Sequence, residues 1–329
     1  MAYVIAEIGI NFDGKFERAK KLIKLAKLCG VDAVKFQIFK ARTLARADSK
    51  KTNDQKKNLK KKDSLSKMWK KMELTEKQIS LLSLIAKKNN LDFLCSVFDL
   101  ESLKKTKKYI DAIKVASSDI TDIELIKEIA KTKKKIILST GMASYKEIKN
   151  TLKYLKKNKV VLLHCVSLYP CPENLINLKR MTTLKKKFNM QVGYSDHSIG
   201  NYASYTAISM GATVLEKHFT DNKKIKGADH LLSADQNDMT KIVNFSKKLN
   251  KIKGDGLISP SVKERSMKKF FRKSIYYNSD IKKGSVISKK NIFAARPFKF
   301  ICSSRMKSLF GKKVKKNLRA NMPVKYSDF

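Results

Sequence analysis

Eight short apolar runs, each followed by a longer amphipathic stretch, constrain the fold of this 329-residue chain more than any other feature. Such runs predict buried β-strands, and the stretches between them have helical spacing; residues 16–29, for example, place Leu22, Ala26 and Cys29 on one face. Eight βα units within about 250 residues predict an α/β fold of the TIM (β/α)8 barrel type rather than an open sheet. The predicted strands cover residues 3–9, 33–39, 92–98, 112–117, 135–140, 160–167, 191–196 and 213–219.

The alternation ends near residues 254–256, which read Gly-Asp-Gly. We therefore predict a barrel domain over residues 1–255, a linker over 256–274 and a small β-rich domain over 275–329. Two similar segments in this tail, 280–287 and 317–324, each have the composition of a turn followed by a short strand. The very basic segment Lys50 to Lys71 follows the second strand and is predicted to be a long surface loop.

The formal charge of +44 has two interpretations. A specific nucleic-acid reader favours clustered arginine, whereas lysines here fall in pairs and triples along the whole chain, as on solvated helix faces. We therefore expect no specific nucleic-acid partner. No apolar run approaches the ~20 residues that cross a bilayer, so no membrane partner is expected. Five cysteines without a C-x-x-C motif, and no leader sequence, favour the cytoplasm; Cys165, beside His164, is predicted to pack rather than react.

Polar and charged residues stand at the ends of nearly all the predicted strands, where the active site of a TIM barrel lies. A lysine inside a barrel is costly unless it meets an anion, and Lys35 and Lys114 both fall within strands. With neighbouring hydroxyls they predict a floor that binds phosphate or carboxylate. The alternative is that each lysine reaches outward between the helices. The candidates at strand ends are Glu7, Lys35, Ser96, Lys114, Ser117, Ser167, Ser195 and Glu216.

Two of the chain's four histidines, His197 and His218, end consecutive predicted strands, each near a carboxylate. They are about twenty residues apart, the length of one βα unit, so both imidazoles should reach the same rim. This arrangement predicts a catalytic divalent metal with open coordination positions. The alternative is a pair of core histidines held by Asp196 and Glu216. Without cysteine ligands, Mn²⁺, Mg²⁺, Co²⁺ and Zn²⁺ all remain open.

Taken together and in this order, these motifs resemble those of the sialic acid synthase family, which includes N-acetylneuraminate synthase and its legionaminic and pseudaminic acid relatives. The tail resembles that family's SAF, or antifreeze-like, domain. Departures such as Phe12 for a usual histidine, Val97 for a proline and Asp119 for a glutamate bear on sugar specificity. The motifs that carry the resemblance are residues 6–11, 34–37, 114–119, 138–142, 164–170, 195–197, 216–220, 229–230 and 296–297.

The resemblance implies a metal-dependent condensation of phosphoenolpyruvate with an open-chain N-acylated mannosamine-type sugar, with phosphate released by C–O cleavage. The first expectation is an N-acetylneuraminate synthase. Alternatives are a legionaminic or pseudaminic acid synthase using a 2,4-diacetamido-2,4,6-trideoxyhexose, or another metal-dependent barrel aldolase or synthase. Mn²⁺ is the expected ion, with Mg²⁺ or Co²⁺ as alternatives, and a domain-swapped homodimer is the expected assembly.

The same resemblance implies a role for each candidate residue. In a swapped dimer the small domain would lend an arginine to the partner's site. The implied roles are Glu7, Glu216, Lys35 and Lys114 for catalysis, Lys35, Ser96, Lys114, Ser117, Ser167 and Ser195 for phosphoenolpyruvate, Tyr169, Asp229 and Arg296 for the sugar, and His197 and His218 for the metal.

Overall fold

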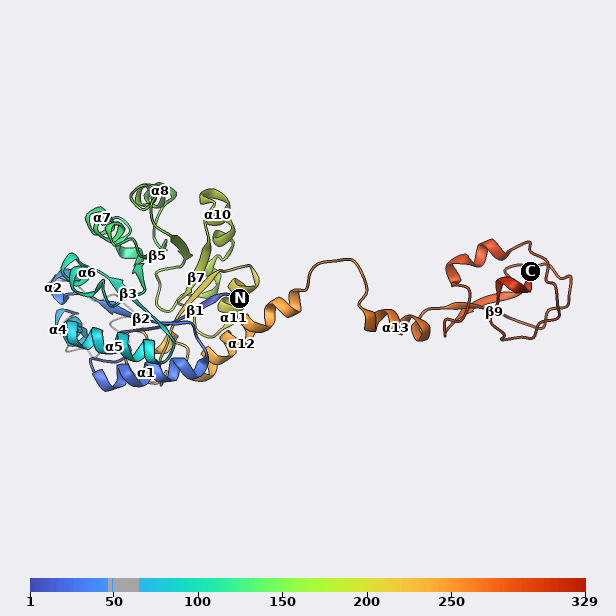
Figure 1. Ribbon diagram of the computed structural model, residues 1–329, viewed down its shortest axis with the longest axis horizontal. Coiled ribbons are helices and arrows are strands. Elements are labelled where there is room, and N and C mark those ends of the chain that lie inside the picture. The colour runs from blue at the N-terminus through green and yellow to red at the C-terminus, as the bar shows by residue number, and fades with distance from the viewer. Residues whose placement is uncertain (47–48, 50–64) are drawn as a thin grey trace. The chain divides into compact units, whose positions relative to one another are not determined.

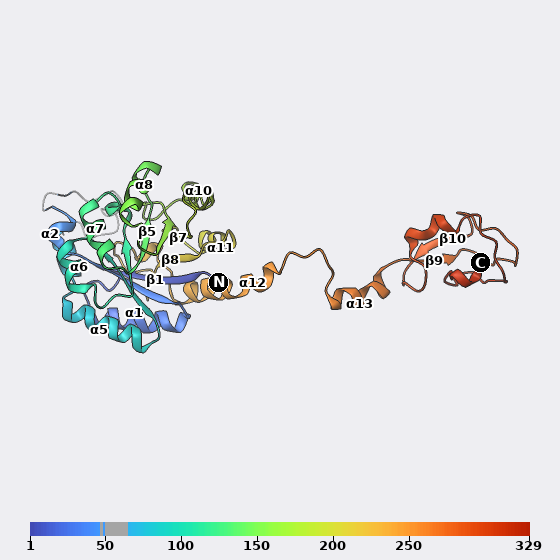
Figure 2. The ribbon, with the colours of Figure 1, turned by 45° about the horizontal axis from the view of Figure 1, so that its top comes forward.

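The computed structural model describes residues 1–46, 49 and 65–329, which form two compact units, Met1–Gly254 and Asp255–Phe329. In the first unit eight parallel strands close into a barrel in chain order, with helices around the outside (Figures 1 and 2). The predicted TIM barrel followed by a β-rich domain is confirmed. The strands are β1 (Tyr3–Gly9), β2 (Ala33–Ile38), β3 (Asp92–Val97), β4 (Ala112–Val115), β5 (Lys135–Ser139), β6 (Val160–His164), β7 (Val192–Asp196) and β8 (Val214–His218).

The helices of the first unit follow the strands and bury their apolar faces against them. The first of them, α1, contacts the helices on either side of it, α5 and α12, and ends at Gly30, whose φ of 77° suits glycine. The helices are α1 (Phe16–Cys29), α2 (Ala41–Leu44), α4 (Leu65–Met72), α5 (Glu76–Lys88), α6 (Leu100–Thr106), α7 (Ile123–Lys131), α8 (Tyr145–Tyr154), α9 (Glu173–Ile176), α10 (Lys179–Phe188), α11 (Tyr202–Ser209) and α12 (Gln236–Lys253), with 3-10 turns η1 (Ser117–Asp119) and η2 (His230–Leu232).

The loop predicted from Lys50 to Lys71 is wrong in its second part. Residues 50–64 lie outside the described residues, but α4 begins at Leu65. Leu65 and Met68 stand one helical turn apart and are both buried, while lysines occupy the other faces of the helix. A narrow apolar stripe therefore holds this lysine-rich segment against the barrel as a helix.

The barrel interior has an apolar floor and a polar upper layer. Because side chains alternate between the two faces of a strand, a residue two positions beyond a floor residue also points inward. Two positions beyond Ile5 and Ala33 stand Glu7 and Lys35, so the inward-facing side chains of these strands change from apolar to charged between one layer and the next. The floor consists of Ile5, Ala33, Leu94, Ala112, Ile137, Val161, Leu163 and Val214, with Tyr3 packed against it.

One glycine in the barrel wall is required by packing. A Cβ on Gly193 of β7 would lie 2.2 Å from the carbonyl oxygen of Val214 and 2.7 Å from Leu163 Cδ2. Real Cβ atoms do not come that close, so any larger residue would push β7 away from its neighbours. Two positions further on, Ser195 enters the polar layer.

The second unit has its own apolar core, which includes Ile275, Tyr277, Ile292 and Leu309. The two similar segments predicted in the tail pair with one another, because Ile281 and Leu318 exchange backbone hydrogen bonds of 2.8 and 2.9 Å. The segment predicted as a linker contains a helix, α13, with no buried residue. The elements of this unit are α13 (Val262–Phe271), antiparallel strands β9 (Ser274–Tyr277) and β10 (Ile292–Ala295), and 3-10 helices η3 (Ser303–Leu309) and η4 (Tyr326–Asp328).

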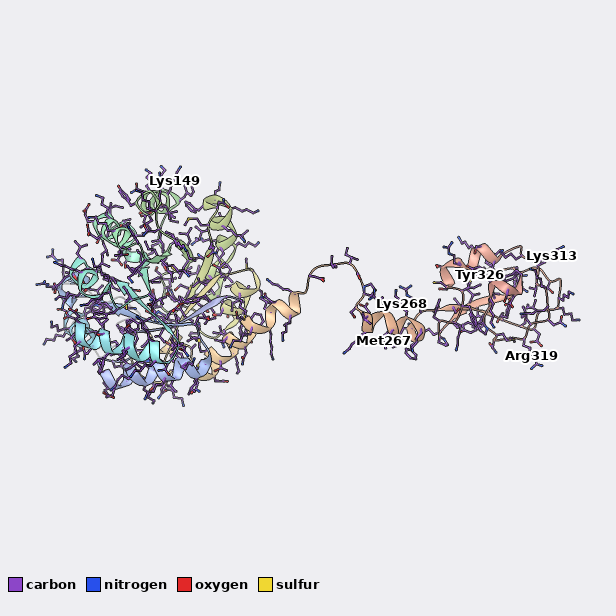
Figure 3. The ribbon with its side chains drawn as sticks, viewed as in Figure 1. Lys149, Met267, Lys268, Lys313, Arg319 and Tyr326 are labelled. Carbon is purple, nitrogen blue, oxygen red and sulfur yellow. The ribbon has the colours of Figure 1, made fainter. Side chains whose placement is uncertain are left out.

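Lysine side chains cover the surfaces of both units; Lys149 on α8 and Lys313 in the tail are two that point into solvent (Figure 3). Within residues 1–46, 49 and 65–329 only three lysines are buried, Lys35, Lys114 and Lys217. These three are exceptions that need an explanation. None of the helices in the described part of the chain is both long and apolar enough to cross a lipid bilayer.

Candidate active site

The two lysines predicted to line the barrel do point into it. Lys35 and Lys114 are 2% and 4% exposed and face the same cavity as Glu7 and Glu216. Lys35 Nζ lies 2.7 Å from Glu7 Oε2 and 3.7 Å from Glu216 Oε2, and it donates a hydrogen bond of 2.9 Å to Ser96 Oγ. Lys114 Nζ lies 3.7 Å from Glu216 Oε1. The alternative of outward-reaching lysines is therefore wrong.

The four charged groups are not equally compensated. Burial opposes the charge of Lys35, but Glu216 and Glu7 outweigh it and raise the pKa of this lysine. Burial lowers the pKa of Lys114, because Glu216 compensates it only in part and Lys35 repels it. Within the described chain, Glu216 is the one ion-pair partner of Lys114. Lys114 is thus the cation with most to gain from an incoming anion.

The two glutamates also differ. Burial raises the pKa of Glu7 despite the nearby ammonium of Lys35. Burial also acts on Glu216, but Lys114 and Lys35 outweigh it and lower its pKa. The two buried carboxyl groups of the site therefore differ in pKa, and Glu7 holds its proton more tightly than Glu216.

Hydroxyl groups surround the lysines. A Cβ on Gly141 would lie 2.6 Å from Ser167 Oγ, 2.8 Å from Ser117 Oγ and 2.9 Å from Cys165 Sγ, so these groups converge where only glycine leaves room. Ser139 also lines the cavity, and its buried Oγ has no hydrogen-bond partner among the described residues. Ser139 was not among the predicted site residues. Its inward position in β5, two residues beyond Ile137, is the signal that would have found it.

His197 and His218 lie side by side, with ring centroids 5.7 Å apart. His197 Nδ1 hydrogen-bonds to the carbonyl oxygen of Val166 at 2.7 Å, which leaves Nε2 facing Ser195 Oγ at 3.3 Å. Burial lowers the pKa of His197 to about 4 and that of His218 well below its ordinary value, so both rings are neutral near pH 7. Tyr169 stacks on His197 at 4.2 Å between centroids.

Asp229, in the loop after β8, lies beside His218, with Oδ2 3.5 Å from Nδ1. This contact is not an ion pair, because burial raises the pKa of Asp229 to about 7 while His218 is neutral. His218 Nδ1 is buried and has no hydrogen-bond partner in the described structure. An unpartnered imidazole nitrogen beside a second neutral imidazole is the donor chemistry that a divalent ion requires.

All the predicted site residues of the barrel line one cavity of about 480 Å³ at the carboxyl ends of the strands. Its rim adds the chain's single tryptophan, Trp69 of α4, which packs edge-on against Phe39. Arg296 belongs to the second unit and is exposed, with its guanidinium 5.8 Å from the ring centroid of Phe271. The barrel residues that the structure brings together are Glu7, Lys35, Ser96, Lys114, Ser117, Ser167, Tyr169, Ser195, His197, Glu216, His218 and Asp229.

The strand-end residue His164 does not face the cavity. It stacks on Tyr194 outside the barrel, and Nε2 hydrogen-bonds to the carbonyl oxygen of Ile176 at 2.7 Å. Its neighbour Cys165 takes the inward position instead, with Sγ 3.1 Å from Ser117 Oγ. The prediction of opposite faces is correct, and the Cys165 side chain, which was predicted to pack rather than react, is buried and also lines the cavity.

The third buried lysine, Lys217, was missed because its strand position points outward. Its Nζ lies 3.0 Å from Asp196 Oδ2 and donates a hydrogen bond of 2.9 Å to the carbonyl oxygen of Ser198. Asp196 also accepts hydrogen bonds from Ser198 and Ser204. This cluster fixes the turn that carries His197. The sequence feature that could have predicted it is the pair of opposite charges, Asp196 and Lys217, at paired outward positions of β7 and β8.

A TIM barrel whose strand ends combine buried ammonium groups, paired carboxyls and neutral imidazoles is the fold and site of an enzyme that acts on anionic substrates. Its sequence matches the pattern of the NeuB family over residues 22–257 and that of the SAF domain over residues 272–329. The chain belongs to the NeuB family and is a synthase.

Several relatives cover nearly the whole chain. The N,N'-diacetyllegionaminic acid synthase of Campylobacter jejuni is 40% identical over 96% of this chain and 96% of its own length. The protein of the same name from Legionella pneumophila is 36% identical over 97% and 92%. Among solved structures, the N-acetylneuraminic acid synthetase of Leptospira borgpetersenii, in complex with citrate, has a TM-score of 0.72 at 32% identity, over 80% of this chain and 89% of that one.

Proposed function

We propose that this chain condenses phosphoenolpyruvate with an open-chain 2,4-diacetamido-2,4,6-trideoxyhexose, as a legionaminic-type nonulosonic acid synthase. The first expectation, an N-acetylneuraminate synthase, gives way to its alternative, because relatives 40% and 36% identical bear the legionaminic name. The observation that carries the reaction class is the pair of buried lysines, Lys35 and Lys114, facing the same cavity as two neutral imidazoles.

The lysines and hydroxyls form the anion-binding half of the proposed site. Phosphoenolpyruvate carries a phosphate and a carboxylate, and Lys114 is the buried cation whose charge is least compensated. An anion beside it would restore the favourable environment that burial removes. The hydroxyls that line the same region are those of Ser96, Ser117, Ser139, Ser167 and Ser195.

His197 and His218 would hold the divalent metal. Both rings are neutral, and His218 Nδ1 lacks a hydrogen-bond partner within the described residues, so the pair suits Mn²⁺, with Mg²⁺ or Co²⁺ as alternatives. Within residues 1–46, 49 and 65–329 no three His, Cys, Asp or Glu side chains form a metal site by themselves. An ion held by two imidazoles would keep coordination positions for substrate and water. Bound there, the ion would act as a Lewis acid toward the sugar aldehyde.

The two glutamates supply the proton transfers. As C3 of phosphoenolpyruvate bonds to the aldehyde carbon, the aldehyde oxygen becomes a hydroxyl and needs a proton. Glu7, whose pKa is raised by burial, is suited to give it. Water adds at C2 and loses a proton, which Glu216 is suited to take. The C–O bond to phosphate then breaks, so one water is consumed and one phosphate is released.

The sugar half of the site would use Tyr169, Asp229 and Arg296. The first two line the cavity of the barrel. Arg296 is exposed on the second unit and, in the proposed swapped homodimer, would reach the N-acyl group of a sugar in the partner's barrel. The proposed compartment is the cytoplasm, where phosphoenolpyruvate is made.

A substrate panel tests this proposal. Phosphate release with phosphoenolpyruvate should be fastest with the 2,4-diacetamido-2,4,6-trideoxy sugar, slower with N-acetylmannosamine and absent with phosphorylated sugars. Chelation should stop turnover, and Mn²⁺, Mg²⁺ or Co²⁺ should restore it. A preference for N-acetylmannosamine would identify the chain as an N-acetylneuraminate synthase, the first expectation. A preference for a sugar phosphate would contradict the proposed reaction class.

A further inference from the structure

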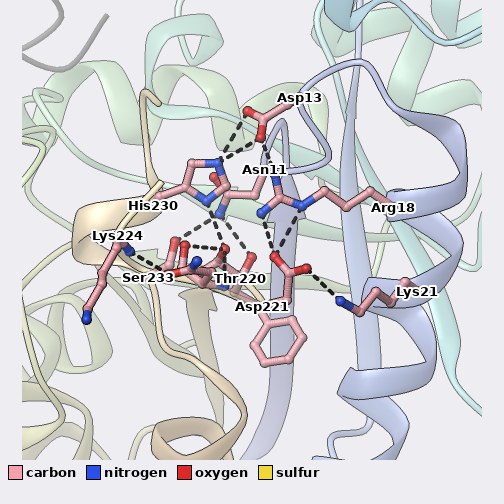
Figure 4. A network of polar contacts seen from close by, with 11 residues as sticks. Asn11, Asp13, Arg18, Lys21, Thr220, Asp221, Lys224, His230 and Ser233 are labelled. Carbon is pink, nitrogen blue, oxygen red and sulfur yellow. Dashed lines mark hydrogen bonds and ion pairs between the residues drawn. The ribbon is translucent and has the colours of Figure 1, made fainter. Parts of the chain in front are cut away.

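A buried histidine outside the cavity joins two loops at the rim of the barrel. We propose that His230 is a positioning residue that fixes the carboxyl group of Asp229 in the sugar half of the site. The inference rests on the proposed function, which gives Asp229 its role as a sugar ligand. Figure 4 shows His230 between Asp13, in the loop after β1, and Thr220, just after β8.

Both ring nitrogens of His230 are engaged. Nε2 lies 3.2 and 3.3 Å from the two carboxylate oxygens of Asp13, and Nδ1 lies 2.8 Å from Thr220 Oγ1. The Asp13 carboxylate accepts a hydrogen bond from Nε2–H, and Nδ1 hydrogen-bonds to the hydroxyl group of Thr220. His230 is fully buried, so neither contact can be replaced by bulk water without opening the loop.

The far side of the network anchors Asp13. Arg18 of α1 pairs with Asp13 and also donates from Nε to Asp221 Oδ1 at 3.1 Å. Lys21, one turn further along α1, reaches Asp221 Oδ2 at 3.1 Å. The loop after β8 is therefore tied to the first helix at two places, through His230 and through Asp221 (Figure 4).

The backbone around Asp229 is packed on the same histidine. A Cβ on Gly227 would lie 2.5 Å from His230 Cδ2, so the chain entering Asp229 runs directly against the ring. On the other side, Ser233 Oγ donates to the carbonyl oxygen of Asp229 at 2.7 Å and accepts from Asn11 Nδ2 at 2.9 Å. The residues on both sides of Asp229 are thus held in place.

The carboxyl group of Asp229 itself receives no hydrogen bond within the described structure. Its nearest polar contact is His218 Nδ1 at 3.5 Å. Its direction into the cavity therefore depends on the backbone that His230 supports. A displacement of about 1 Å at a substrate-binding group can lower a rate by about a hundredfold, so the network should control sugar binding without touching the sugar.

Steady-state kinetics of His230→Ala, His230→Gln and Asp13→Asn, in the full chain with saturating metal, test the proposal. The alanine variant should raise the sugar KM by about tenfold to a hundredfold while the phosphoenolpyruvate KM stays within twofold. Gln keeps a donor toward Asp13 and should recover part of the loss. Asp13→Asn perturbs the network from its outer end and should reproduce the effect in milder form, even if the alanine variant does not fold.

A double variant gives the sharpest test. If His230 acts through Asp229, adding His230→Gln to Asp229→Asn should raise the sugar KM no further. Additive losses, equal losses for both substrates, or an unchanged sugar KM in every folded variant would overturn the proposal. Lys24→Ala, at an exposed position of α1 outside the drawn network, is the matched control and should stay within twofold of wild type. No turnover in the wild-type protein would instead contradict the proposed function.

Discussion

Replacing Lys114 with methionine separates the role of its charge from the role of its volume. The methionine side chain has a similar length and no charge, so it should fill the space without leaving a cavity. Burial already lowers the pKa of Lys114, which means that the folded protein gains little from its charge. Glu216 loses one ion-pair partner but keeps Lys35 at 3.7 Å, so the variant should still fold, with a melting temperature at or somewhat below that of wild type.

Catalysis should respond very differently. Lys114 Nζ is buried and has one carboxylate at 3.7 Å, so an incoming phosphate or carboxylate becomes its main partner. Removing one member of a buried charge pair costs about 3–5 kcal/mol. At 1.4 kcal/mol for each factor of ten, kcat/KM for phosphoenolpyruvate should fall by about 10²- to 10⁴-fold.

Two measurements check this expectation. Phosphate release gives kcat/KM, and the fluorescence of Trp69, the chain's single tryptophan and part of the cavity rim, reports phosphoenolpyruvate binding without turnover. Lys149→Met, the same chemical change at an exposed position on α8, is the matched control. If the Lys114 variant kept kcat/KM within threefold of wild type, the assignment of the anion-binding half would be refuted.

Three further predictions follow from packing, titration and the second unit. Gly193→Ala should lower the free energy of unfolding by about 3 kcal/mol or more, because its Cβ would lie 2.2 Å from a backbone oxygen of β8; an unchanged denaturation midpoint would contradict the packing. In metal-free protein the pKa of His197 is lowered from 6.5 to about 4, so this group makes the folded state less stable as the pH falls through that range. The pKa of Asp229 is raised from 3.8 to about 7, so this group makes the folded state more stable as the pH falls from 7 to 3.8. Asp229→Asn removes this compensation, so its stability should fall more steeply than that of wild type between pH 6.5 and 4.5, by up to about 3 kcal/mol, and parallel curves would refute the assignment. Arg296→Ala should raise the sugar KM and leave the phosphoenolpyruvate KM unchanged, unlike the exposed control Arg319→Ala; equal behaviour of the two variants would remove Arg296 from the site.

The sequence predicted the barrel well because its signal is local. Periodicity within a few residues identifies each strand, and the observed β1 has the predicted bounds, Tyr3–Gly9, while the other strands differ mainly by shorter ends. The helix from Phe16 to Cys29 was likewise predictable from one apolar face ended by a glycine. Segment 65–72 was misjudged because it continues a very lysine-rich stretch and only two of its residues, Leu65 and Met68, are buried.

Site residues were predictable where an unusual residue type stands at the end of a strand. They were less predictable where the direction of the side chain, or a contact with a residue far away in the sequence, determines the role. Lysine and histidine at strand ends are rare enough to stand out. Between the neighbours His164 and Cys165, only the register of the sheet decides which one faces inward. The contact of His230 with Asp13 joins residues 217 positions apart, and no local pattern announces it.

An apolar floor lies under the charged layer, so the cavity is reached from the carboxyl ends of the strands. Lys35 and Lys114 lie in strands directly above that floor, whereas Tyr169 and Asp229 stand on loops nearer the opening. A molecule bound between the loops would block the way to the lysines beneath it. We therefore expect compulsory order of arrival, with phosphoenolpyruvate first and the sugar second, and inorganic phosphate competing with phosphoenolpyruvate for the empty enzyme.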